Sequence, residues 1–377
     1  VLFIPLIRTC KSFSPKSIFQ IAKENLSQRA AGRKLWITCS TTDEMIDAVK
    51  YFVKPGQTVA ELGSQLRGVS ISICESLQGD GKAVLLDVPR KPPKNRSSLS
   101  RIKDMRLPGN EHDFFPDVAT FQQISCLDDW KQGFLDSSHV YNVMVLDVNS
   151  IVGNDLEITS LSIAKEFSSL FEECGVVLIK SAALNVWAAR LIHGQKWIDA
   201  KQSEKGDTTM PPHVIGTVGV QEYRSMIPYT VGKGDAVLEV GCHLGTSTAL
   251  LHEASDGNGG YAIGVDVGPK IIEGAKKRYP NTPFSVGDAW KVADLLRIQA
   301  GLVKHGGISE SSRKVGFDVI FVDVGGLSGR DGLLEALMLL ICLINGLEPR
   351  CIVIKSQCVR RTASSLVPFR LFQKNKS

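Results

Sequence analysis

The sequence lacks the features that define several large classes of protein. No run in its 377 residues approaches the roughly 20 apolar residues of a membrane-spanning helix. Its nine cysteines include no Cys-x-x-Cys pair, and several lie in apolar runs, which indicates buried thiols in a reducing compartment rather than disulfides or zinc. The histidines also lack the spacing of metal ligands, so we expect no metal site; those considered are His193, His213, His252 and His305.

A strong charge of one sign is also absent. The net charge of +5 neither requires nor excludes a nucleic-acid partner. Residues 1–34 form a basic N-terminal tail with seven Lys or Arg, one Glu and four Ser. This composition resembles an organelle transit segment, which would place the chain in a mitochondrion or plastid. The alternative is an ordinary basic tail on a cytoplasmic protein.

What the sequence does contain is a long internal repeat. Residues 35–62 align with residues 213–240 at an offset of 178, and the correspondence continues at Asp87 and Asp266. It also includes the segments VVLIKS and IVIKS, which place Lys180 opposite Lys355. A repeat of this length predicts two copies of one fold.

Each copy alternates short β-branched runs with longer amphipathic stretches, which is typical of a parallel sheet covered by helices. We therefore predict an α/β protein with two tandem Rossmann-like, three-layer domains and mostly parallel sheets, at 35–205 and 206–377. A polar linker is expected at 201–212 and an exposed basic insertion at 89–113. The expected strands are 58–62, 83–88, 119–125, 143–148 and 176–180 in the first copy, and 236–240, 262–267, 282–288, 318–324 and 351–355 in the second.

The second copy carries a pattern of residues suited to a nucleoside ligand. Its first strand runs into a turn that contains Glu239, Gly241, His243 and Gly245, and such Gly-rich turns let a ligand approach a helix N-terminus. Asp266 ends the second strand, where a Rossmann-type sheet binds a ribose diol. Asp288 and Trp290, which follow the third strand, offer an adenine a hydrogen-bond acceptor and a ring face.

The ordered set VLEVGCHLGT, GVDV, VGDAW and FDVIFVDV resembles the class I S-adenosylmethionine-dependent methyltransferases over about 140 residues. The resemblance implies S-adenosylmethionine as cofactor, with Glu239, Gly241 and Gly245 around its methionine end. It further implies that Asp266 binds the ribose and that Asp288 and Trp290 bind the adenine. His243 departs from the family, which usually has a second glycine there. A structural Rossmann turn without a ligand is the alternative interpretation.

The first copy fits this pattern less well. Asp87 keeps the ribose position, but Arg67 stands opposite Gly245, and the match around Asp128 and Trp130 is looser. A long side chain at the close-approach glycine would occupy the space of the cofactor. We therefore predict a degenerate copy that does not bind S-adenosylmethionine; the alternative is that Arg67 recruits an anionic ligand.

Both copies end their fourth strand in Asp and their fifth in Lys: Asp147 with Lys180, and Asp323 with Lys355. Strand ends of a parallel sheet meet at one crevice, where a Lys beside a carboxylate can orient or deprotonate a hydroxyl. FVDV followed by VIKS resembles the Asp and Lys positions of fibrillarin-like and related RNA 2′-O-methyltransferases. The resemblance implies catalytic roles for Asp323 and Lys355; an ion pair without catalytic function is the alternative.

The resemblance implies an S-adenosylmethionine-dependent methyltransferase, and RNA is the first candidate for its acceptor, contacted in part by the basic insertion at 89–113. The alternative for this insertion is a solvated loop that binds nothing. A small-molecule O-methyltransferase and a non-catalytic scaffold of two decayed methyltransferase folds are the alternatives. No Asn-Pro-Pro-Tyr-type motif follows either fourth strand, which argues against N-methylation. Class I enzymes usually add a sixth and an antiparallel seventh strand, yet only 22 residues follow Lys355. We expect those strands to be contributed otherwise, or the chain to be incomplete there.

Overall fold

The structure is a computed structural model that describes residues 34–64, 68–87, 119–123, 140–153, 155–170, 174–203, 214–304, 316–327, 329 and 332–370. Several predictions concern residues outside these ranges. They are the basic tail up to residue 33, Arg67, the insertion at 89–113, Asp128, Trp130, residues 204–212 of the linker, His213 and His305.

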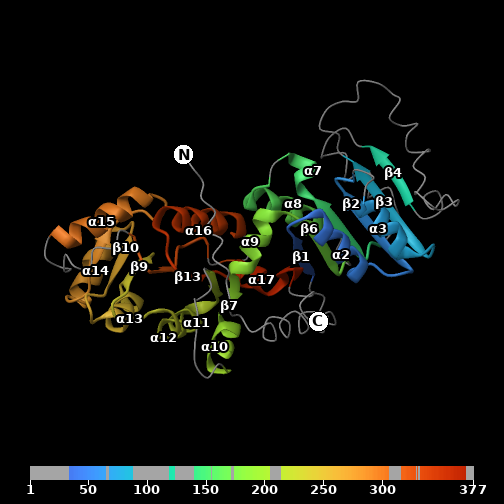
Figure 1. The fold of residues 1–377 in the computed structure, drawn as a ribbon. Coiled ribbons are helices and arrows are strands. Elements are labelled where there is room, and N and C mark those ends of the chain that lie inside the picture. Colours follow the sequence, from blue (N-terminus) through green and yellow to red (C-terminus); the bar gives the residue numbers. More distant parts are fainter. Residues whose placement is uncertain are drawn as a thin grey trace. The chain divides into compact units, whose positions relative to one another are not determined.

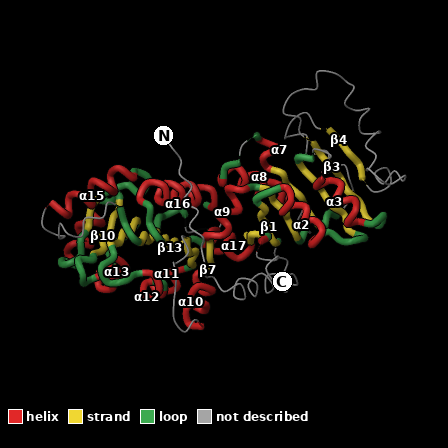
Figure 2. The backbone as a smooth tube through the Cα atoms, viewed as in Figure 1, coloured by secondary structure: helices red, strands yellow, loops and turns green. Residues whose placement is uncertain are grey.

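The described residues form two compact units, each built on a seven-stranded sheet (Figure 1). The first unit comprises residues 34–189 together with 365–370, and the second comprises Arg190–Ser364. Every pairing between named strands is parallel, and helices alternate with strands along the chain (Figure 2). The predicted α/β, Rossmann-like class with mostly parallel sheets is confirmed.

The sheet of the first unit has the strand order β14-β1-β6-β5-β2-β3-β4. Its strands are β1 (Leu35–Cys39), β2 (Gln57–Leu62), β3 (Gly81–Asp87), β4 (Ala119–Gln123), β5 (Val143–Asp147), β6 (Val176–Lys180) and β14 (Leu366–Pro368). Its helices are α2 (Thr42–Phe52), α3 (Gly68–Leu77), α7 (Val148–Val152), α8 (Glu157–Leu170) and α9 (Ala182–Arg190).

The sheet of the second unit, read from the opposite edge, has the corresponding order β7-β8-β13-β12-β9-β10-β11. Its strands are β7 (Leu191–His193), β8 (Val214–Thr217), β9 (Ala236–Val240), β10 (Tyr261–Asp266), β11 (Phe284–Val286), β12 (Val319–Val322) and β13 (Cys351–Lys355). Its helices are α10 (Gly194–Ser203), α11 (Gly219–Ser225), α12 (Ile227–Thr230), α13 (Thr246–Ser255), α14 (Pro269–Arg278), α15 (Val292–Lys304), α16 (Leu333–Leu347) and α17 (Gln357–Ser365).

All ten expected strands are present, and four more, β1, β7, β8 and β14, were not expected. The central strands are continuous apolar runs because both faces of a parallel sheet are covered. In β12 (VIFV) and the first four residues of β13 (CIVI), every residue is buried. The prediction of buried thiols is also borne out: six of the seven described cysteines are buried and free, and Cys342 is exposed. No helix among the described residues is long and apolar enough to span a membrane.

Each sheet has one edge strand that follows, in the sequence, the fifth expected strand of the other sheet. Helix α9 passes directly into β7, which pairs with β8 in the second unit. Helix α17 passes directly into β14, which pairs with β1 in the first unit through Trp36 and Leu366. The two positions beyond the fifth strand are thus filled by parallel strands contributed from elsewhere in the chain. The predicted domains, 35–205 and 206–377, differ from the units in the placement of β7, α10 and β14.

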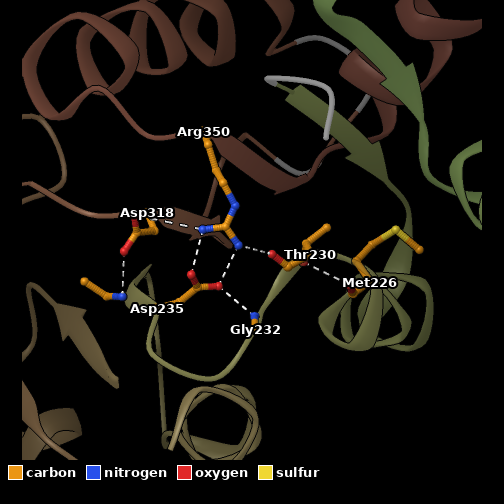
Figure 3. Close-up of polar contacts among 7 residues, drawn as sticks. Met226, Thr230, Gly232, Asp235, Asp318 and Arg350 are labelled. Carbon is orange, nitrogen blue, oxygen red and sulfur yellow. Dashed lines mark hydrogen bonds and ion pairs between the residues drawn. The ribbon is translucent and has the colours of Figure 1, made fainter. Parts of the chain in front are cut away.

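An ionic cluster joins the amino ends of three strands in the second unit (Figure 3). The guanidinium of Arg350 donates to both carboxylate oxygens of Asp235, at 2.7 and 2.6 Å, and to the carbonyl of Thr230 at 2.8 Å. A carboxylate oxygen of Asp318 accepts the N–H of Ala236, the first residue of β9. Bidentate Arg–carboxylate pairs are among the stronger polar contacts, so this cluster fixes the end of the sheet opposite the predicted site.

Candidate functional site

The Gly-rich turn after β9 has the backbone conformation that the sequence predicts. Gly241, His243 and Gly245 have φ angles of 77°, 47° and 80°. A Cβ on Gly241 would lie 2.2 Å from the carbonyl oxygen of Asp323, so only glycine fits against the end of β12. His243 takes the left-handed conformation that favours glycine, and the residue is exposed.

Packing within the unit accounts for the glycine at 245. A Cβ there would lie 2.4 Å from the ring of Phe284, and a Cβ on Gly264 would lie 2.7 Å from the same ring. The residue also starts α13 in a left-handed conformation, which a larger residue adopts only at a cost. The absence of a side chain at Gly245 therefore lets the ring of Phe284 pack beneath the turn.

Asp266 lies where the sequence places it, at the carboxyl end of β10. One carboxylate oxygen accepts the N–H of His243 at 3.2 Å, and the other accepts the N–H of Gly268 at 3.0 Å. The carboxylate thus joins the turn after β9 to the turn after β10. Each oxygen has a second lone-pair direction, so the side chain is oriented and retains acceptor capacity for a ligand.

Asp288 and Trp290 follow β11 at the same end of the sheet. Asp288 accepts the backbone N–H of Trp290 at 3.0 Å, and the Trp290 side chain is 44% exposed. Three more apolar side chains are exposed at these strand ends: Leu244, Val267 and Val286. Val286 stands opposite Asp266 in the pairing of β10 with β11. These apolar side chains beside a fixed carboxylate were not identified from the sequence, where only Trp290 stood out.

Glu239 lies below the turn and is almost completely buried. Its carboxyl accepts the hydroxyl of Tyr223 at 3.2 Å and the hydroxyl of Thr248. Burial raises the pKa of Glu239 to about 7, which the two hydroxyl donors partly oppose. The carboxyl therefore braces α11 and α13 against β9. Tyr223 belongs to the site through this contact, and only its correspondence with Met45 marked it in the sequence.

Asp323 and Lys355 come together as predicted. The Nζ of Lys355 lies 2.5 Å from each carboxylate oxygen of Asp323, and both side chains are about three-quarters buried. Burial and the nearby carboxylates of Glu239 and Asp323 raise the pKa of Tyr223 well above its usual value. The structure thus gathers Gly241, Glu239, Asp323 and Lys355 at one part of the strand ends, and His243, Asp266, Asp288 and Trp290 at another.

The first unit repeats the strand-end pair. Lys180 Nζ lies 2.8 Å from an Asp147 oxygen, and Glu61 is buried and accepts the hydroxyl of Ser70 at 2.7 Å. Burial raises the pKa of Glu61 to about 7, as in the second unit. Among the described residues, no group of three or more His, Cys, Asp or Glu is arranged to hold a metal ion.

Comparison with known proteins gives limited information. No family model and no curated protein matches the chain. Among solved structures, a TehB-like SAM-dependent methyltransferase from Corynebacterium glutamicum matches at 18% identity with a TM-score of 0.22, over 41% of this chain and 63% of that one. A possible exported protein from Bordetella parapertussis matches at 13% identity and a TM-score of 0.24, over 44% of this chain and 53% of that one. The chain thus spans less than two thirds of either, and likenesses this low carry no argument about its function.

Proposed function

We propose that the second unit binds S-adenosylmethionine and that the chain is a methyltransferase. The observation that carries the proposal is the Asp266 carboxylate, which is fixed by two backbone N–H groups at the end of β10 and has apolar side chains exposed beside it. This combination suits a nucleoside, since its ribose diol donates to a carboxylate and its base packs on apolar surface.

Different residues would contact different parts of the ligand. Asp266 would accept from the ribose, while Trp290 and Asp288 would contact the base. The turn of Gly241 and Gly245 would face the methionine end. When bound, the cofactor supplies an activated methyl group on a sulfonium. The Nζ of Lys355 is held by Asp323 and would donate to the acceptor oxygen, which orients it for in-line attack, and the Asp323 carboxylate would accept the proton that the hydroxyl loses.

Binding is tested by calorimetry with S-adenosylmethionine, with tryptophan fluorescence as a second readout; because the chain has five tryptophans, the signal of Trp290 is identified by its loss in Trp290→Phe. We expect one site per chain. Asp266→Asn should weaken binding by at least about 30-fold through the loss of charge-assisted hydrogen bonds, while Asp87→Asn leaves it unchanged. Thermal melting of Asp266→Asn checks that the turn still folds. Absence of heat and of a fluorescence change at about 1 mM ligand would favour the scaffold alternative.

The assignment of Lys355 predicts a separation of binding from turnover. Lys355→Met should keep the affinity for S-adenosylmethionine within about threefold and lower methyl transfer at least about 100-fold. Lys180→Met, the matched change in the first unit, should alter neither. Equal rates for the Lys355→Met and native proteins would assign the Asp323–Lys355 pair to structure.

For the acceptor, we propose RNA. The support is the sequence of the insertion at 89–113, which contains seven Lys or Arg; six of them would contact phosphates: Lys91, Lys94, Arg96, Arg101, Lys103 and Arg106. Filter binding of total RNA should then weaken with salt at a log–log slope of about −4 for six contacts to a single strand. Changing all six residues to Gln should abolish that slope. Unchanged RNA retention in this variant would direct the search to small hydroxylated acceptors.

A further inference from the structure

The first unit contains a cavity of about 160 Å³ at the carboxyl ends of its central strands. Nine residues from α2, β2, α3, β5 and β6 and the turn after β2 line it: Thr42, Met45, Glu61, Gly63, Val69, Ser70, Val145, Asp147 and Lys180. All of them belong to one unit. A cavity of about 150 Å³ is large enough for a ring the size of benzene, so this one has room for a small molecule and not for a nucleoside.

The cavity arises where three side chains are smaller than their counterparts in the second unit. Tyr223 and Phe321 pack edge to face there, with ring centroids 5.1 Å apart. The repeat replaces Tyr223 by Met45, and strand pairing places Val145 opposite Glu61 as Phe321 is placed opposite Glu239. The third smaller side chain is Ser70, which corresponds to Thr248 at an offset of 178. Two aromatic rings and a methyl group are thus absent from the wall, and all three smaller residues line the cavity.

The charges of the wall select the class of ligand. The lining contains two carboxylic acids, Glu61 and Asp147, against one ammonium, that of Lys180. Lys180 is already bound to Asp147, and Glu61 is 3% exposed; among the described residues, its side-chain hydrogen bonds come from the hydroxyls of Ser70 and Ser64. An anionic ligand would face a buried carboxyl, whereas a cation would pair with it. Met45, Val69 and Val145 supply an apolar side for a short hydrocarbon chain.

We propose that this cavity binds a small primary ammonium compound, with its cation at Glu61 and Asp147 and its alkyl chain on Met45 and Val145. The site is separate from the one proposed in the second unit. The neutral form of Glu61 is favoured by burial and by the charges of Asp147 on β5 and Asp87 on β3, and the Cys74 thiol on α3 also faces it. The bound cation would ionise Glu61, so affinity should rise as the pH passes upward through the pKa of this group, about 7.

The test is calorimetry of the full chain with n-butylamine and 1,4-diaminobutane, with L-norvaline to show whether an added carboxylate is tolerated, and with butanoate as the anionic control. We expect both amines to bind with a dissociation constant of 1 mM or below at about pH 8, at least fivefold more weakly at about pH 6, and butanoate not to bind. No heat from either amine at about 10 mM would overturn the proposal and leave the cavity to water.

Two variants and one control variant keep the test specific. Glu61→Gln should weaken amine binding at least tenfold, while Glu75→Gln, an exposed change on the same helix that carries Ser70, should have no effect. Met45→Tyr should fill the cavity with the ring of its counterpart and abolish binding without lowering the melting temperature. Amine binding that survives Met45→Tyr would place it elsewhere and contradict the proposal. Titration of the same variants with S-adenosylmethionine tests the second unit independently.

Discussion

The two units share one strand order and differ at both ends of their strands. At the carboxyl ends, a buried glutamate is retained in each, yet Glu239 is held by Tyr223 and Thr248 whereas Glu61 has Ser70 and a cavity beside it. The strand-end ion pair is also present in both. The common parts are thus backbone and charge, and the difference lies in the side chains that fill the space above them. One scaffold can therefore present two different binding surfaces.

The amino ends of the strands differ between the units at three positions that belong together. Gln57 and Asn142 stand in the first unit where the second has Asp235 and Asp318, and Gly175 stands in place of Arg350. The amides keep the hydrogen bonds of the acids: Gln57 accepts from the N–H of Lys54, and Asn142 from the N–H of Thr58, each at 2.8 Å. The first unit lacks the guanidinium and has neutral amides at both of these positions. This is expected because an unpaired, partly buried charge is costly.

The largest effect should come from removing β14, because this breaks one unit and spares the other. Leu366, Val367 and Phe369 are buried in the first unit. Ending the chain after Ser365 should remove about 5 kcal/mol or more of burial, comparable to the whole stability of a typical domain. Hydrogen exchange should show β1 and β6 unprotected, with β9 and β12 still protected. A chain that ends after Arg370 is the control; protection of β1 in the shorter chain would contradict the reciprocal exchange of strands.

A smaller effect should distinguish the units at their amino ends. Arg350→Ala removes the guanidinium from two largely buried carboxylates, Asp235 and Asp318, and should destabilise the second unit by about 2 kcal/mol. Hydrogen exchange of β9 and β12 at increasing denaturant would measure it, because these strands report on the second unit alone. Arg297→Ala, which breaks a pair whose Arg side chain is 77% exposed, should cost less than about 0.5 kcal/mol. Equal costs for the two changes would show that the buried cluster has no special weight.

The most specific effect is in the pH dependence of stability. Glu61 and Glu239 each have a pKa raised to about 7 by burial. Between about pH 5 and about pH 7, the folded state therefore binds protons that the unfolded state has released, and the free energy of unfolding falls as the pH rises. Glu61→Gln should flatten this slope for the first unit only, and Glu239→Gln for the second only. Hydrogen exchange of β2 and β9 at several pH values separates the two.

Much of the fold was predictable because the signals are local. Apolar runs such as VIFV mark the central strands of a parallel sheet, and all ten of those expected are present. The outer strands β7 and β14 are three residues long and begin at the last turn of a helix, so no turn signal separates them. The partner of β14 lies far away in the sequence, since Leu366 pairs with Trp36, and β7 pairs with β8 across α10, Leu191 with Val214. Neither pairing can be inferred from a three-residue apolar stretch.

The positions of the site residues at the strand ends could be predicted from the sequence. Strand-end residues such as Asp266 and Lys355 are fixed by the topology, since carboxyl ends of parallel strands meet. The contacts of each side chain were less accessible. Glu239 points into the protein toward Tyr223, and the glycine at 245 admits the ring of Phe284. Those contacts depend on packing between elements, which the sequence pattern does not specify.

The direct passage of α17 into β14 has a consequence for the order of events during synthesis. When the ribosome has made Lys180, the first sheet has all its strands except β14, which appears only after a further 188 residues. At typical elongation rates this delay is on the order of ten to forty seconds. Throughout it, the edge of β1 has unpaired backbone groups, the condition under which chaperones bind and neighbouring chains pair wrongly. The first half to be translated is thus the last to be completed.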